Sequence, residues 1–128
     1  MSPILSAVFA TSSLSAVWGY FWWRNTLHLS KARRLLDAGA IVLDVGTPEQ
    51  FAADHLSGAI NIPAEGLAHR RDELGAHAQP VIVYARSAMR SSVAAQTLRG
   101  AGFHAVLSVG TLRRWRAAAP EGPGRLRG

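Results

Sequence analysis

The chain of 128 residues contains no cysteine. This absence excludes disulfides, thiolate zinc sites and any catalysis that uses a cysteine nucleophile or a persulfide carried on this chain. The five histidines show no spacing typical of metal ligands, so we expect neither a metal site nor a cofactor. The redox compartment stays undecided, because a chain without cysteine suits both sides of a membrane.

Acidic residues are also scarce. The chain has 14 Lys and Arg against 8 Asp and Glu, a net charge of +6 and an isoelectric point of about 11.3. A basic excess suits acidic partners, either nucleic acid or anionic lipid, although it also describes an ordinary solvated surface. Outside the N-terminal segment the basic residues are not interleaved with aromatics, so we expect no nucleic-acid partner. A hydrophobic content of 48% over this length predicts one globular domain.

The segment from Met1 to Trp23 has no charged side chain. Its apolar run, Ile4 to Trp23, has about the 20 residues needed to cross a bilayer, and it ends in aromatics followed by Arg24. We therefore predict a transmembrane signal anchor over residues 1–23 that contacts the membrane through residues 4–23. The basic residues that follow predict a single-pass protein with a cytoplasmic domain. The alternatives are a cleaved signal peptide, which would leave the domain periplasmic or secreted, and a buried helix of a soluble protein.

Apolar runs alternate with helical patterns in the rest of the chain. Runs bounded by glycine or proline predict strands at 41–45, 58–63, 81–84 and 104–109. Capping signals and helical spacing predict helices at 30–39, 47–55, 65–74 and from Ser91 or Ser92 to about 100, and a basic turn at 113–116. The alternation predicts an α/β domain with a mostly parallel sheet flanked by helices over residues 24–116. Residues 117–128, rich in proline, glycine and arginine, predict a disordered tail.

The segment V-I-V-Y-A-R-S-A-M-R-S-S, residues 81–92, predicts a buried strand, a short loop from Ala85 to Arg90 and a helix start. This geometry aims backbone N–H groups at an anion. Ligands of parallel sheets bind beyond the carboxyl ends of the strands, where we expect Asp44 and Gly46 to support the loop. The predicted ligand is a small oxyanion: thiosulfate, sulfate or phosphate. The predicted anion-binding residues are Arg86, Ser87, Ala88, Met89, Arg90 and Ser91. The alternative is that the arginines are surface charges on a plain connection.

Several short motifs occur in a family-specific order. They are Leu43-Asp44-Val45, Glu49-Gln50-Phe51, His55, Gly58-Ala59-Ile60-Asn61-Ile62-Pro63, the segment Val83 to Ser91, Ala101-Gly102-Phe103, Gly110 and Trp115. This series resembles the rhodanese (thiosulfate sulfurtransferase) domain over residues 28–116. With the N-terminal span, the arrangement is similar to the membrane-anchored single-domain rhodaneses of bacteria. The resemblance implies a five-stranded α/β sheet with helices on both faces. It also implies a loop cysteine that takes a sulfane sulfur from a donor such as thiosulfate and passes it to an acceptor.

Three positions depart from the family pattern. Ala85 occupies the position of the cysteine, Ala88 that of a loop glycine, and Gly46 that of an arginine. A methyl group cannot carry a persulfide, and the thioether of Met89 is too weak a nucleophile to replace a thiolate. If position 88 needs a positive φ, alanine there costs about 1 kcal/mol.

The favoured interpretation is therefore a membrane-tethered, catalytically inactive sulfurtransferase homologue that retains an anion-binding loop. Its protein partner is not identified by the sequence. The alternative is a cysteine-to-alanine version of an active thiosulfate sulfurtransferase. A phosphatase or arsenate reductase on this loop is disfavoured, because these chemistries normally need a cysteine. We expect Asp44 and His55 to be structural, Trp115 to pack in the core or a lid, and Arg113, Arg114 and Arg116 to form a solvated cluster or contact anionic lipid.

Overall fold

The computed structural model describes residues 15–20 and 29–118. The chain divides into two compact units, residues 1–30 and 31–128, and the sheet belongs to the second. Residues 15–20 are helical. Within the described ranges, no helix has both the length and the apolar character needed to cross a bilayer. Most of the predicted anchor over 1–23, and residues 119–128 of the predicted tail, lie outside these ranges, so both stay predictions.

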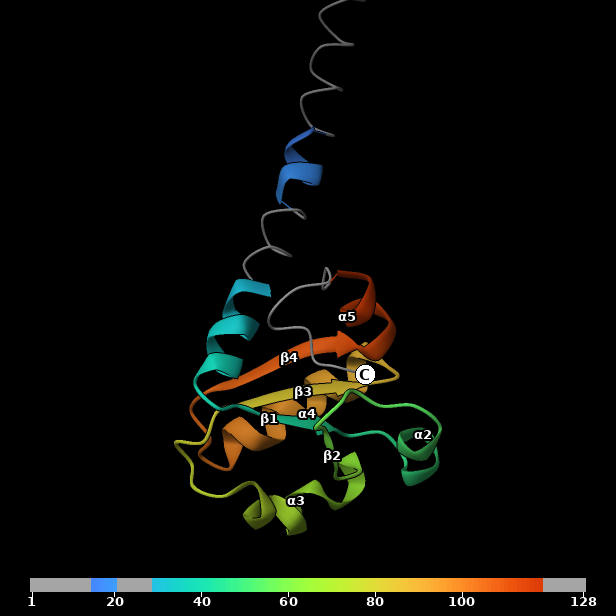
Figure 1. Cartoon of the computed structure of the whole chain (residues 1–128). Coiled ribbons are helices and arrows are strands. Elements are labelled where there is room, and N and C mark those ends of the chain that lie inside the picture. Colours follow the sequence, from blue (N-terminus) through green and yellow to red (C-terminus); the bar gives the residue numbers. More distant parts are fainter. Residues whose placement is uncertain (1–14, 21–28, 119–128) are drawn as a thin grey trace, which may run out of the picture. The chain divides into compact units, whose positions relative to one another are not determined.

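The second unit is built on a parallel sheet in the order β2-β1-β3-β4 (Figure 1). Its strands are β1 (Ile41–Asp44), β2 (Ile60–Asn61), β3 (Val81–Ala85) and β4 (Val106–Thr111). Every side chain of β3 is buried, because this strand lies in the interior of the sheet and is covered on both faces. The predicted α/β class and parallel sheet are confirmed.

The expectation of five strands is wrong for the described residues, which form four. The fifth strand came from the family resemblance and had no apolar run of its own in the sequence. Between residues 29 and 118, every segment outside the four strands is a helix, a turn or an irregular connection.

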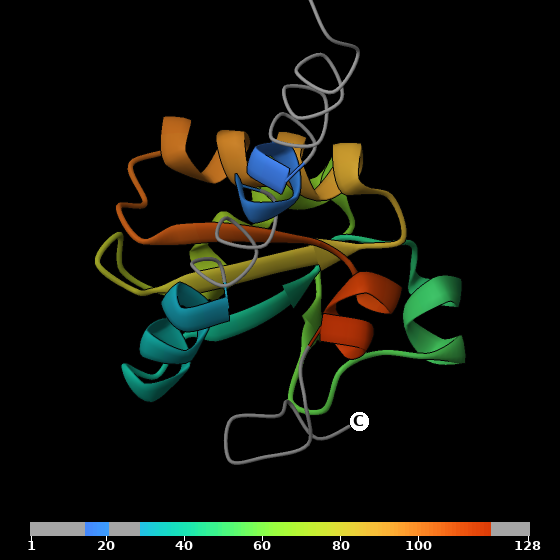
Figure 2. The same cartoon turned by 90° about the horizontal axis from the view of Figure 1, so that it is seen from above.

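Helices cover the sheet on both faces (Figure 2). Residues 31–37, the part of the first helix that belongs to this unit, and α5 (Leu112–Ala118) lie on one face, and α4 (Ala88–Gly100) lies on the other. The first of these helices, predicted from residue 30, already includes residue 29. Because α5 continues to Ala118, the predicted tail begins two residues too early.

The short helices follow local signals. α2 (Pro48–Ala53) has the predicted capping box, in which Thr47 and Gln50 each accept from the other's backbone. The helix predicted at 65–74 is instead three short pieces, η1 (Ala64–Gly66), α3 (Leu67–Arg70) and η2 (Arg71–Leu74). Glycine at position 66 favours this break, since it is a poor helix former.

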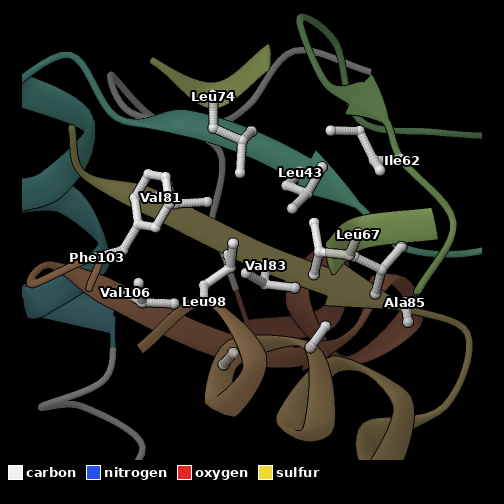
Figure 3. Close-up of a cluster of buried hydrophobic side chains, with 13 residues drawn as sticks. Leu43, Ile62, Leu67, Leu74, Val81, Val83, Ala85, Leu98, Phe103 and Val106 are labelled. Carbon is white, nitrogen blue, oxygen red and sulfur yellow. The ribbon is translucent and has the colours of Figure 1, made fainter. Parts of the chain in front are cut away.

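The core packs the sheet against α4 and α3 (Figure 3). It contains Leu43 from β1, Val81 and Val83 from β3, and Leu98 from α4, each with no exposed surface. Alanines at 94 and 95 let α4 approach the sheet closely, because their side chains are small. This packing fixes the N-terminus of α4 just beyond the end of β3.

The start of α4 differs from the prediction. The helix begins at Ala88, not at Ser91 or Ser92, and Ser87 is its N-cap. No described residue other than glycine has a positive φ, so Ala88 carries none of the strain considered from the sequence. Alanine is the best helix former and serine a favoured cap, so these residues convert half of the expected loop into helix.

Candidate functional site

The position of the missing nucleophile lies inside the fold. Ala85 is the last residue of β3, has no exposed surface and belongs to the core cluster drawn in Figure 3. Only Arg86 and Ser87 separate it from the first residue of α4. The expected six-residue loop is thus a two-residue connection. Ala85, which was expected to be the first residue of the loop, instead belongs to the strand and packs among apolar side chains.

Asp44 anchors this end of the sheet. It ends β1 and is fully buried. One carboxylate oxygen, Oδ1, accepts from the amide of Gly46 at 2.8 Å. The other, Oδ2, accepts from Nη1 of Arg86 at 3.1 Å. A buried carboxylate requires such donors, and these contacts agree with the structural role expected for Asp44.

The Asp44 carboxylate limits the space around Gly46. A Cβ atom at position 46 would lie 2.9 Å from Oδ1 of Asp44 and 2.8 Å from Oε1 of Gln50. Both distances are too short for any side chain to fit without displacement of its neighbours. An arginine at this position, as in the family pattern, would therefore require the side chains of Gln50 and Asp44 to move.

The side chain of Arg86 points toward the protein and not toward solvent. In addition to Asp44, its guanidinium donates to the carbonyl of Gln50 at 3.0 Å and to the carbonyl of Asp54. It also lies over the ring of Tyr84, 5.8 Å from the centroid. With three acceptors and one aromatic ring as partners, this guanidinium is held between Asp44 and the end of α2.

Arg90 is held differently. Its Nε donates to the carbonyl of Val45 at 2.7 Å, and its Nη2 donates to Oε2 of Glu65 at 2.8 Å. The side chain of Glu65 is 70% exposed, against 0% for Asp44. The neighbouring arginine and the amide of Glu65 itself lower the pKa of this carboxyl, with the amide contributing most.

Two further polar side chains complete the site. The Tyr84 hydroxyl accepts from the amide of Leu56 at 3.0 Å. Burial, together with the Asp44 carboxylate, raises the pKa of Tyr84, so the hydroxyl stays neutral at physiological pH. Asn61 donates from Nδ2 to the carbonyls of Asp44 and Gly46, at 2.9 and 3.0 Å. The Asn61 contacts join β2 to the end of β1, and the Tyr84 contact joins β3 to the segment before β2.

Arg116 binds α5 to the segment after α2, at the carboxyl end of the sheet. Arg116, predicted to be part of a solvated cluster, instead binds the Asp54 carboxylate through both terminal nitrogens. Trp115 is buried, which confirms its packing role. His55 stacks on Phe51 at 3.8 Å, and its Nδ1 lies 2.7 Å from the Phe51 carbonyl near the end of α2, as expected for a structural histidine.

The predicted residues are brought together in part. Asp44 accepts from Gly46 and Arg86, and Arg90 donates to the carbonyl of Val45, the residue between Asp44 and Gly46. Ser91 turns away from it and bonds Ser108 on β4 at 2.8 Å, while Met89 is exposed on α4. Five further residues of this region were not predicted as partners, although Asn61 and Tyr84 stood in the motifs and Arg116 in the basic cluster: Asp54, Asn61, Glu65, Tyr84 and Arg116.

The chemical capacity of the site is narrow. It contains no thiol, and within residues 15–20 and 29–118 no cluster of three His, Asp or Glu side chains can hold a metal ion. Its remaining binding groups are backbone amides at the start of α4. Ser87 accepts from the amide of Arg90 at 3.4 Å, so the amides of Ala88 and Met89 are the ones without an intrahelical acceptor.

The fit of Gly46 gives a stability prediction. We expect Gly46→Ala to lower the free energy of unfolding by about 1–3 kcal/mol, since the new methyl group displaces Gln50 and the buried carboxylate of Asp44. Urea denaturation of the full chain measures the change. Gly100→Ala in α4 is the control, because its Cβ meets nothing within 4 Å and should leave stability equal or higher. Equal effects at both positions would contradict the prediction.

Comparison with known proteins supports this description. A family model described as Rhodanese-like domain matches residues 28–118. The chain is 36% identical over 77 residues to the uncharacterized protein YqhL of Bacillus subtilis, covering 59% of this chain and 60% of that protein. It is 34% identical over 95 residues to the thiosulfate sulfurtransferase GlpE of Ectopseudomonas mendocina, covering 71% of this chain and 84% of that protein.

A solved structure agrees with the fold. A rhodanese with anions from E. coli has a TM-score of 0.56 at 30% identity, covering 59% of this chain and 89% of the other. The region matched by the family model contains every strand and helix from β1 to α5. The chain therefore belongs to the Rhodanese-like domain family.

Proposed function

We propose that this protein is a catalytically inactive rhodanese-like module, tethered to a membrane, whose start of α4 binds small oxyanions weakly. The observation that carries the proposal is Ala85, which stands at the nucleophile position, fully buried, in a chain without cysteine. Sulfur transfer through a persulfide needs a thiolate at this point, and no other residue of the chain supplies one.

The surroundings of Ala85 favour a lasting loss over a single substitution in an active enzyme. Ala88 is the first helical residue, and a side chain at position 46 would displace the side chains of Gln50 and Asp44. A cysteine-to-alanine version of an active sulfurtransferase remains the alternative. In that case the connection around Ala85 would support catalysis as soon as the thiol returned.

Restoring the thiol separates these two possibilities. In a thiosulfate:cyanide sulfurtransferase assay we expect the parent and Ala85→Cys to be inert, since a side chain at position 85 points into the core. The double variant A85C/A88G is expected to regain measurable turnover, because glycine loosens the first turn of α4. Ser92→Cys, exposed on the same helix, controls for unspecific thiol chemistry.

Turnover by Ala85→Cys equal to that of the double variant would support the active-enzyme alternative. Turnover by the parent would overturn the proposal, because sulfur transfer would then proceed without cysteine.

The oxyanion proposal is supported by three features. The amides of Ala88 and Met89 open the thirteen-residue helix α4, where the helix dipole favours negative charge. Arg86 and Arg90 are close to these two residues in the sequence and bring two positive charges to this end of the sheet. The related E. coli rhodanese is a structure with anions.

Binding is expected to be weak, because both arginines already have acceptors within the protein. We expect thiosulfate, sulfate or phosphate at millimolar concentration to shift the NMR amide resonances of residues 86–91 in the full chain. Chloride at the same ionic strength is the control. Resonances that do not move with any of the three oxyanions would contradict this part of the proposal.

The tether is proposed from the sequence of residues 4–23, which are uncharged and end in aromatics before Arg24. We expect the full chain to stay with the membrane fraction after extraction at alkaline pH, and the domain to be digested by protease only when the cytoplasmic side is accessible. Release into the supernatant would contradict the tether. Digestion from the outer side would instead favour a domain beyond the membrane.

A further inference from the structure

The two arginines at the start of α4 are neutralised in different ways. Arg86 is bound to a carboxylate with no exposed surface and to two carbonyls at the end of α2. Arg90 is bound to a carboxylate that is 70% exposed, on a three-residue 3-10 turn. Separating Arg86 from Asp44 would leave a buried charge without its partner, whereas Glu65 can rotate into water. Arg90 is thus the cation of this site that is released at low cost.

Arg90 keeps its place when Glu65 leaves. Its Nε is held by the carbonyl of Val45 at 2.7 Å, independently of the Nη2 that meets Glu65. The guanidinium would therefore stay at the first turn of α4 and offer Nη2 to another acceptor. The geometry that holds a carboxylate oxygen at 2.8 Å suits an oxygen of a small oxyanion equally well.

Glu65 is also held near Arg90 by its backbone. It lies in η1, which contacts α4, and its turn is joined to the residue after β1 by the hydrogen bond from Ala64 N to Val45 O. The same carbonyl of Val45 accepts from Arg90. A carboxylate attached this closely has a high effective concentration at the guanidinium, so a free anion must compete with it.

We propose that Glu65 is a built-in competitor that occupies Arg90 and sets the affinity of the site for oxyanions. This inference rests on the anion-binding part of the proposed function, and assigns the control of that binding to one side chain outside the predicted loop. An exposed ion pair of this kind contributes a modest free energy, so its removal strengthens anion binding by roughly two- to fivefold.

The test compares sulfate binding to four forms of the full chain by NMR titration of the Ala88 and Met89 amides, at constant ionic strength. Glu65→Gln removes the charge and is expected to bind sulfate about two- to fivefold more tightly than the parent. Glu65→Asp keeps the charge but shortens the side chain, so it should lose contact with Arg90 and resemble Glu65→Gln. Glu73→Gln is the matched control, because Glu73 forms an exposed pair with Arg70 on α3 and η2 at 2.7 Å.

The outcomes separate this inference from the proposed function. Tighter binding by both Glu65 variants, with Glu73→Gln equal to the parent, supports competition by contact; so does binding that appears only when Glu65 is changed. Equal affinities in all four forms overturn the role of Glu65 and leave anion binding intact. If Glu65→Asp binds sulfate with the affinity of the parent while Glu65→Gln binds it more tightly, the effect comes from the negative charge alone. That result also overturns competition by contact with Arg90. Sulfate binding by none of the forms overturns anion binding itself.

Discussion

The buried carboxylate of Asp44 is the interaction on which the carboxyl edge of this sheet depends. It has no exposed surface and accepts hydrogen bonds from the amide of Gly46 and from Arg86. An uncompensated charge in such a position would cost several kcal/mol, so both donors must stay in place. Arg86 in turn binds the last carbonyls of α2, and Asp54 there binds Arg116 of α5. One carboxylate therefore determines how β1, α2, α5 and the connection after β3 meet.

The buried central strands could be predicted from the sequence, whereas the ends of the edge strand β2 and the start of α4 could not. Strands 41–44 and 81–85 were predicted within a residue, since parallel strands buried on both faces give continuous apolar runs. The short edge strand β2 was predicted too long, because the apolar Ile62 beyond it is buried without pairing in the ladder. The predicted start of α4, Ser91 or Ser92, was three or four residues too late, although Ser87 is a favoured cap and Ala88 a strong helix former.

The site shows a similar division. Asp44, Gly46, Arg86 and Arg90 were expected at one edge because parallel strands end together, and they do lie together. Their partners were not predictable in the same way. Arg90 and Glu65 are 25 residues apart and Arg116 and Asp54 are 62 apart. No periodicity relates such positions, and opposite charges can be matched only once the topology is known. Arg86, Arg90 and Arg116, which suggested free cations, instead bind carboxylates and carbonyls of the protein.

The early start of α4 has a consequence for the history of the chain. Because β3 extends through Ala85 and the helix opens at Ala88, a cysteine restored by mutation at position 85 would emerge within the core. If the proposed function is correct, that step alone gives no sulfur transfer, and glycine at position 88 without the thiol gives none either. Under the proposed function, the route back to sulfur transfer therefore passes through changes at both position 85 and position 88, and neither change restores the reaction alone.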